Sequence, residues 1–196
     1  MENFKSEGKY SAIDNLQKRL ESAGIDTSLW GVGRAKTLAH LQEELENGEV
    51  ILIEGENGEL IRQGVVVGAD IYYKSHDGKK YYLREERQIF RDGRVRERKL
   101  EQSVSEKLKR GEDPENAMIR GLKEELGIDG EIHMQMIKTY EKVVNSSSYP
   151  GLLSRYTIHW FRVVLTDDQF NPEGYIEEQP DKTTYFVWKE IKENTS

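Results

Sequence analysis

The stretch Arg110-Gly-Glu-Asp-Pro-Glu-Asn-Ala-Met-Ile-Arg-Gly-Leu-Lys-Glu-Glu-Leu-Gly-Ile128 carries the strongest structural signals in the chain and decides the fold. Asp113 is a good N-cap residue, and Pro114 at the first helical position lacks an N–H that would have no partner there. Apolar residues recur at every fourth position, and the glycine after the last of them is a typical helix stop. The stretch therefore predicts a helix whose buried face comprises Met118, Leu122 and Leu126.

A different face of this predicted helix is charged. Glu124 and Glu125 are adjacent carboxylates that follow Arg120 by four and five residues. Two carboxylates beside one arginine can bind a hard cation such as Mg²⁺ through oxygen ligands. A ladder of surface salt bridges is the commoner use of the same spacing. The spacing alone therefore leaves both a metal site and a salt-bridge ladder open.

The same stretch resembles the Nudix box, the signature of the Nudix hydrolase superfamily. The family pattern reads Gly, five residues, Glu, seven residues, Arg-Glu, an aliphatic residue, any residue, Glu-Glu, any residue, Gly and an aliphatic residue. The second half of this pattern matches, and the segment YFVWKEI at 185–191 is similar to the family's closing strand and turn. The matching positions are Glu112, Arg120, Leu122, Glu124, Glu125, Gly127 and Ile128.

The chain departs from the family pattern at two positions. Gly121 stands where the family has a glutamate directly after the arginine, and that glutamate is usually a magnesium ligand or the catalytic base. A glycine inside a helix also costs about 1 kcal/mol relative to alanine, so it calls for a reason such as close packing. Glu106 stands where the family opens with a glycine, whose carbonyl often binds the metal. We expect Glu106 to be solvated, or alternatively to replace the missing ligand.

The resemblance implies an α+β fold, a Nudix-like α/β/α sandwich with a mixed β-sheet. Residues 1–75 are not explained by it and contain two helical patterns followed by two strands around a glycine-containing loop. We therefore expect an N-terminal helix–helix–hairpin extension over residues 1–75 and a Nudix-like core domain over residues 76–196. Apolar runs predict strands at 49–54, 60–73, 80–90, 132–144, 155–165 and 183–188.

The segment Arg91-Asp92-Gly93-Arg94 is a strong hairpin signal, because Asp-Gly suits a two-residue type I′ turn. A two-residue loop would pair Arg87 with Arg98 and would gather arginines on one face of the hairpin. Such a face is either simply solvated, which is the commoner case, or binds anions, since guanidinium forks suit phosphates. Its members would be Arg87, Arg91, Arg94, Arg96 and Arg98.

The resemblance also implies a chemistry, because Nudix enzymes cleave a diphosphate linked to another moiety with Mg²⁺ or Mn²⁺ held by the box helix. Carried over by position, Glu124 and Glu125 would be metal ligands and catalytic residues. Arg120 would orient one of them through a charge-assisted pair. Glu112 would be a structural or secondary metal ligand. The expected function is thus a divalent-metal-dependent pyrophosphohydrolase acting on a nucleoside diphosphate-linked or related pyrophosphate substrate.

Two parts of the expected site lie outside the box. Arg87, Arg96 and Arg98 would bind the substrate, either through its phosphates or through the moiety linked to the diphosphate. Family members often recruit a further carboxylate from a loop near the last strands. The candidates for it in this chain are Glu173, Glu177, Glu178 and Asp181.

Two alternatives stand beside the hydrolase. A Nudix-fold protein that has lost catalysis could bind a nucleotide-like ligand or a protein partner, and Gly121 favours this possibility. A related isomerase on the same fold acts on a prenyl diphosphate but needs a catalytic cysteine, and this chain has none.

Composition narrows the remaining possibilities. The 36 acidic and 29 basic residues give a net charge of −7, which argues against a stable complex with nucleic acid, although a local basic patch remains compatible. The lack of cysteine excludes disulfides, cysteine–zinc sites and thiol nucleophiles. No run of apolar residues is long enough to cross a membrane, and the polar start is unlike a secretory signal. We expect a cytoplasmic protein that does not bind membranes and that could form a homodimer through residues 1–75.

Overall fold

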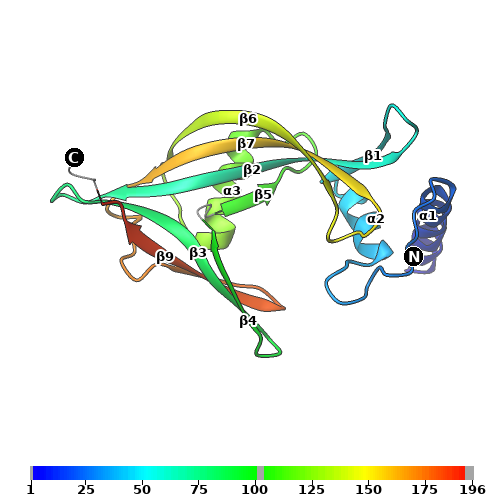
Figure 1. Ribbon diagram of the computed structural model, residues 1–196, viewed down its shortest axis with the longest axis horizontal. Coiled ribbons are helices and arrows are strands. Elements are labelled where there is room, and N and C mark those ends of the chain that lie inside the picture. The colour runs from blue at the N-terminus through cyan, green and yellow to red at the C-terminus, as the bar shows by residue number, and fades with distance from the viewer. Residues whose placement is uncertain (1, 101–103, 193–196) are drawn as a thin grey trace. The chain divides into compact units, whose positions relative to one another are not determined.

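The computed structural model of the chain describes residues 2–100 and 104–192 (Figure 1). Within these residues the chain forms three helices and nine strands. The helices are α1 (Glu2–Ser22), α2 (Leu38–Glu46) and α3 (Pro114–Leu126). The strands are β1 (Val50–Glu54), β2 (Leu60–Lys74), β3 (Lys80–Phe90), β4 (Val95–Leu100), β5 (Val104–Lys107), β6 (His133–Asn145), β7 (Leu153–Leu165), β8 (Tyr175–Glu178) and β9 (Lys182–Glu190).

The chain divides into two compact units, which we call unit 1 and unit 2. The described residues of unit 1 are 2–65, 108–111 and 141–157, and those of unit 2 are 66–100, 104–107, 112–140 and 158–192. Unit 1 is therefore built from three separate segments, whereas the extension predicted for residues 1–75 is continuous. No helix within the described residues is long and apolar enough to span a membrane.

Unit 1 contains the two helices and the hairpin expected near the N-terminus, and these three elements are confirmed. The N-cap residue of α2, Thr37, accepts a hydrogen bond from the His40 backbone N–H, which satisfies an otherwise unpaired donor. Strands β1 and β2 pair antiparallel from Val50↔Gly64 to Glu54↔Leu60. One hydrophobic core cluster of this unit consists of Leu16, Leu20, Leu41, Val50, Leu52, Leu60, Tyr149 and Leu152.

A buried ion pair lies beside this core. Arg62 and Glu44 are only 2% and 5% exposed, and the guanidinium donates from Nε (3.0 Å) and Nη2 (2.5 Å) to Glu44 Oε2. Lys36 Nζ lies 2.8 Å from the other Glu44 oxygen. Arg62 Nη1 donates to the Tyr156 hydroxyl over 2.7 Å. Glu44 is thus surrounded by positive charge, which is the condition under which a buried carboxylate is tolerated.

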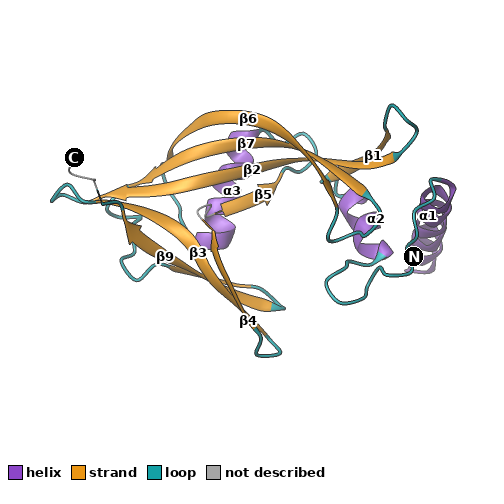
Figure 2. Ribbon diagram, in the orientation of Figure 1, coloured by secondary structure: helices purple, strands orange, loops and turns teal. Residues whose placement is uncertain are grey.

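The strands form a sheet in the order β6-β7-β2-β3-β9-β8, with β4 paired to β3 and β5 paired to β2. Neighbouring strands β2 and β7 run in the same direction, whereas β3, β5 and β9 pair antiparallel with their neighbours (Figure 2). The sheet is therefore mixed. The predicted α+β class with a mixed sheet is confirmed.

Helix α3 forms as its sequence predicts. Asp113 accepts hydrogen bonds from the backbone N–H groups of Glu115 and Asn116, and Gly127 ends the helix in the left-handed conformation with φ of 67°. The predicted stripe of Met118, Leu122 and Leu126 is buried. In unit 2, α3 is the only helix among the described residues, and it lies against one face of the sheet (Figure 2).

Alternate residues of β2 and β7 form the core on the helix side of the sheet. The side chains of Ile71 and Phe161 are fully buried, whereas their neighbours Tyr72 and Arg162 are not. Because successive side chains of a strand point to opposite faces, the second set lies on the face away from α3. The fully buried residues of these strands in unit 2 are Val67, Ala69, Ile71, Phe161 and Val163.

Two expectations about the strands are wrong. The turn after β3 has a three-residue loop, because the Phe90 N–H donates to the Arg94 carbonyl and Gly93 adopts φ of 82°. The register consequently pairs Arg87 with Glu97 and Gln88 with Arg96, which places Arg87 and Arg96 on opposite faces of the hairpin. The predicted single arginine face therefore does not form. The second error concerns Glu177 and Glu178, which were expected in a loop near the last strands and instead lie in strand β8.

Candidate functional site

Arg120 is held by a carboxylate from the turn before α3. Its Nε and Nη2 atoms donate to the two oxygens of Glu112 over 2.9 and 3.0 Å, a bidentate pair of the strong, charge-assisted kind. Its Nη2 atom also donates to the Lys107 carbonyl over 2.8 Å. The hydrogen bonds to Glu112 hold the pKa of Arg120 above its usual value. Both Glu112 oxygens thus serve to fix the guanidinium in place.

The remaining nitrogen of Arg120 faces two more carboxylates. Nη1 lies 3.3 Å from Glu124 Oε2 and 3.4 Å from Glu106 Oε1. The Glu124 side chain is 54% exposed, whereas Arg120 is largely covered. Arg120 therefore joins β5, α3 and the turn before α3 in a single charged network.

Glu125, by contrast, is surrounded by like charge. Burial is the largest cause that raises the pKa of its carboxyl, and the nearby carboxylates of Glu177 and Glu106 raise it further, to about 9. A hydrogen bond with the Ser105 backbone offsets this only in part, and Glu85 adds more negative charge. Four carboxylates from α3, β8, β5 and β3 thus converge, and we call them the carboxylate cluster: Glu85, Glu106, Glu125 and Glu177.

Cations lie on the Glu85 side of this cluster. Glu85 is 8% exposed, and burial raises the pKa of its carboxyl, while the charges of Arg98, Lys182 and Arg96 act in the opposite direction. Arg98 Nε lies 3.3 Å from Glu85 Oε1. Carboxylates and cations thus meet at the place where β3, β4 and β9 pair.

The two departures from the Nudix box lie against each other. A Cβ atom on Gly121 would lie 3.1 Å from Glu106 Cβ and 3.3 Å from Val104 Cγ1, which is tighter than normal packing. A side chain on that helix position would therefore require β5 to shift. In this chain the carboxylate is on strand β5 and the glycine is on helix α3. Close packing against β5 therefore explains the glycine at position 121, although glycine destabilises a helix.

The structure brings some of the predicted residues together and separates others. Glu125 lies near Glu177 and Glu106, and Arg96 and Arg98 lie near Glu85. Arg87 instead stacks over the ring of Tyr185 at 4.4 Å from the ring centroid. Its Nη1 atom donates to Glu86 Oε2 over 3.1 Å. The other three loop carboxylates that were candidates are exposed: Glu173, Glu178 and Asp181.

Sequence reasoning missed Glu85 and Lys182. The alternation of β3 places Glu85 on the same face as buried Leu83, so a charged residue on an apolar face was the available signal. Lys182 had no signal of its own, because its charge reaches Glu85 only after β9 pairs with β3.

The cluster fits a divalent cation in the type of its donors. Hard cations prefer carboxylate oxygens, and a half-buried Glu125 among like charges is the group that a cation would neutralise. As the side chains of the described residues stand, no three carboxylates or imidazoles form a group close enough to bind an ion together. Binding would therefore need side chains such as Glu106 and Glu124 to turn away from Arg120.

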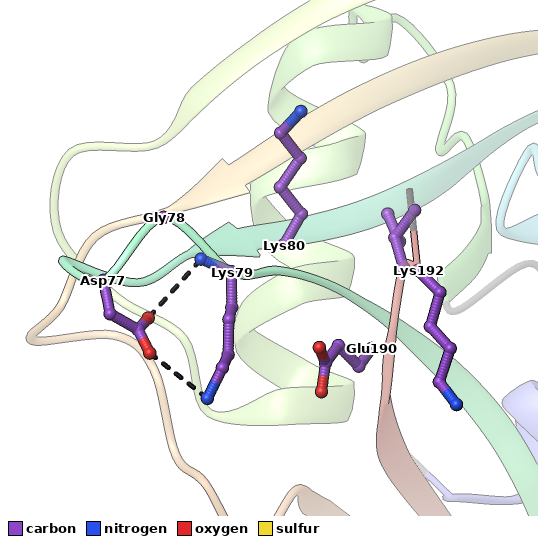
Figure 3. Close-up of a pocket in the computed structure, with 7 residues that line it drawn as sticks. Asp77, Gly78, Lys79, Lys80, Glu190 and Lys192 are labelled. Carbon is purple, nitrogen blue, oxygen red and sulfur yellow. Dashed lines mark hydrogen bonds and ion pairs between the residues drawn. The ribbon is translucent and has the colours of Figure 1, made fainter. Parts of the chain in front are cut away.

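Three hollows lined by described residues lie elsewhere in unit 2. One is formed at the turn between β2 and β3, where Asp77 accepts from the Lys79 backbone and pairs with its Nζ at 3.2 Å (Figure 3). Glu190 and Lys192 line its other side (Figure 3). These charges already pair or point to solvent, and the hollow includes none of the cluster residues. We therefore place the candidate site at the carboxylate cluster, on the basis of its electrostatics.

Comparison with known proteins gives structural similarities only. No family model and no curated protein matches the chain. The Ap4A hydrolase of C. elegans is 17% identical with a TM-score of 0.36, over 66% of this chain and 80% of that chain. The dihydroneopterin triphosphate pyrophosphohydrolase of E. coli is 22% identical with a TM-score of 0.39, over 64% and 77%. The Nudix hydrolase RenU of M. smegmatis is 15% identical with a TM-score of 0.37, over 71% and 79%. All three TM-scores are low, and we base the proposal that follows on the side chains of the site.

Proposed function

We propose that this protein is a Nudix-type hydrolase that uses Mg²⁺ or Mn²⁺ to cleave a diphosphate bond in a nucleoside diphosphate-linked or related small molecule. The observation that supports it is the convergence of Glu125, Glu106 and Glu177 beside the cations around Glu85. A metal-bridged pyrophosphate needs both kinds of group, since carboxylates bind the ion and cations bind the phosphate oxygens.

In this proposal the residues have distinct roles. Glu125 binds the ion, with Glu106 and Glu124 as further ligands once they leave Arg120. Glu112 keeps Arg120 in place, which is the structural role of the two expected for it. When bound, a divalent ion polarises phosphorus–oxygen bonds and lowers the pKa of the attacking water.

The cations supply the substrate-binding side of the proposal. Arg98 and Arg96 lie on β4 near Glu85, together with Lys182 on β9. A guanidinium presents two parallel donors to a phosphate, which a lysine cannot do. Arg87 contributes less to substrate binding in this proposal, because it lies on the opposite face of the hairpin from Arg96 and stacks on Tyr185.

Phosphate release from a panel of nucleoside diphosphate-linked compounds, with and without Mg²⁺ or Mn²⁺, tests the proposal. Glu125→Gln is the test variant, and Glu115→Gln, on the exposed first turn of the same helix, is its matched control. We expect metal-dependent turnover in the wild type and in Glu115→Gln, and a loss of at least 100-fold in Glu125→Gln. Turnover that survives in Glu125→Gln would refute the assigned site.

Gly121 favours a second candidate function, a catalytically impaired protein that binds a nucleotide-like ligand or a protein partner. Gly121 packs so closely on Glu106 that the family's glutamate would fit there only if its neighbours on β5 moved slightly. Absence of turnover, together with a melting temperature raised by one compound of the panel, would favour this candidate over the hydrolase.

A further inference from the structure

The face of the unit 2 sheet that lies away from α3 carries aromatic and basic side chains. Trp160 and Arg162 on β7 alternate with the fully buried Phe161 and Val163, so they point away from the core. Tyr72 on β2 and Lys138 and Tyr140 on β6 lie on the same side. We call this surface the open face: Tyr72, Lys138, Tyr140, Trp160, Arg162 and Val164.

Cation–π contacts connect these side chains across three adjacent strands. Lys138 Nζ lies 5.2 Å from the ring centroid of Tyr140 and 5.5 Å from that of Trp160. The guanidinium of Arg162 lies 5.6 Å from the ring centroid of Tyr72. Each aromatic ring of the open face is thus accompanied by a cation within the usual range of a cation–π contact.

Glycine makes the middle of this face flat. A Cβ atom on Gly68 of β2 would collide with the six-membered ring of Trp160. The indole therefore lies over bare backbone, as a platform. Tyr140 and Val164 on either side are 38% and 41% exposed, so no described residue of unit 2 covers this surface.

A hollow continues the open face toward the end of β2. Its lining comprises three cations and no acidic residue among the described ones, although the whole chain has a net charge of −7. Asp70 is the acidic residue of β2 on this side, and it is half-buried. The residues that line the hollow are Tyr72, Tyr73, Lys74, Lys80, Arg162, Val164 and Ile191.

We propose that the open face binds single-stranded nucleic acid, with bases stacked on the aromatic rings and phosphates paired with the cations. Aromatic rings stack on any base because every base has a π-face, and a basic groove follows the backbone. An exposed sheet can stack about two or three bases in this way. In a duplex the bases are already stacked and paired, so the aromatic rings would gain little. The site is separate from the carboxylate cluster, so it does not depend on the proposed hydrolase.

Fluorescence anisotropy with labelled oligo(dT) and oligo(U) of about 12 nucleotides tests this proposal. The titration is done in EDTA between 50 and 200 mM salt, so that the proposed metal-dependent cleavage takes no part. We expect the logarithm of the binding constant to fall linearly with the logarithm of the salt concentration. The steepness of this line is expected to decrease by about 0.7 in Arg162→Gln and by about the same amount in Lys80→Gln. Tyr72→Leu is expected to weaken binding by about 5-fold or more, because it removes a stacking ring. Asp70→Asn is expected to strengthen it.

The matched control is Arg94→Gln, which removes an exposed arginine from the turn between β3 and β4 and is expected to leave the affinity unchanged. Equal melting temperatures of the variants establish that the folds are comparable. Three results would each overturn the proposal: no oligonucleotide binding at 50 mM salt, equal binding of an inorganic polyphosphate of the same charge, or equal loss of binding in Arg94→Gln and Arg162→Gln. Quenching of Trp160 fluorescence by oligo(dT), lost in Trp160→Phe, would support it independently.

Discussion

Each unit of this protein contains a glutamate that is withdrawn from water, and the two glutamates have opposite surroundings. Glu44 in unit 1 receives Arg62 on one oxygen and Lys36 on the other. Glu125 in unit 2 has Glu177, Glu106 and Glu85 for neighbours and is partly offset by a backbone hydrogen bond. The first arrangement is complete within the protein and needs nothing further. The second is unfavourable without an added cation or a proton, which supports the proposed cation site.

The largest expected effect on stability comes from breaking the ion pair between Glu44 and Arg62. Burial lowers the pKa of Arg62, and the charge of Glu44 and its hydrogen bond more than offset this. Arg62→Met leaves Glu44 buried without its main partner, so we expect a loss of about 3–5 kcal/mol in the free energy of unfolding. Urea unfolding followed by circular dichroism measures it. A loss below about 1 kcal/mol would mean that Glu44 is as unsatisfied as Glu125, and the contrast would fail.

Replacing the Glu125 carboxyl by a neutral group is expected to raise the free energy of unfolding, rather than lower it. The carboxyl has a pKa of about 9 in the folded protein and 4.5 in the reference state. The folded protein therefore binds more protons between these values, and its stability falls as the pH rises from 4.5 toward 9. The contribution is at most about 1.4 kcal/mol per pH unit for one proton.

Glu125→Gln removes this pH dependence and is expected to be more stable than the wild type at pH 8 in EDTA. Unfolding curves in urea at pH 6, 7 and 8 measure the difference, with Glu115→Gln as the control that should follow the wild type. Parallel pH profiles for the wild type and Glu125→Gln would show that Glu125 is not surrounded by uncompensated negative charge.

The packing of Gly121 on Glu106 gives the next effect. Gly121→Glu forces a side chain into a space where Cβ alone would lie 3.1 Å from Glu106 Cβ, and we expect a loss of about 1–3 kcal/mol. Adding Glu106→Gly removes the obstructing side chain, so the double variant should recover part of the loss. The coupling between the two substitutions, measured by urea unfolding, is expected to exceed about 0.5 kcal/mol. Strict additivity would show that the two positions do not share one space.

The smallest effect concerns the start of the helix that carries Glu125. Asp113 accepts from the Glu115 and Asn116 N–H groups over 2.9 and 3.1 Å, and Asp113→Ala leaves both without this acceptor. The expected loss is about 1 kcal/mol, typical of an N-cap. Thermal unfolding measures it, with Asp113→Asn, which keeps an acceptor, as the control. Equal losses in both variants would show that the charge of Asp113, rather than its hydrogen bonds, matters.

Helix α3 could be predicted from the sequence because each of its signals is local. Asp113, Pro114 and Gly127 mark its ends by their own backbone preferences, and the spacing of its apolar residues marks its buried face. Strands β1, β2, β3, β6, β7 and β9 were found by similar local patterns, whereas β5 and β8 were not. The hairpin register was not, because Asp-Gly is compatible with both a two-residue and a three-residue loop, and only the paired strands decide between them.

Features that depend on distant segments could not be predicted in this way. Strand β8 forms where Gly174 has φ of 83° and passes so close to β9 that a Cβ atom would collide with the Phe186 carbonyl oxygen. That strand brings Glu177 to the site, while neighbouring Glu173 and Glu178 stay exposed. The role of Glu85 likewise depends on the pairing of β3 with β4 and β9.

The central claim, that Glu125 lies in a divalent-cation site, is tested most directly by calorimetric titration of the protein with Mn²⁺ at pH 8. The wild type and Glu115→Gln are expected to bind with the same affinity. Glu125→Gln is expected to bind at least 10-fold more weakly, because an amide cannot lose a proton to become the carboxylate ligand that the ion favours. Equal Mn²⁺ affinity in all three proteins, or no binding by the wild type, would contradict the claim.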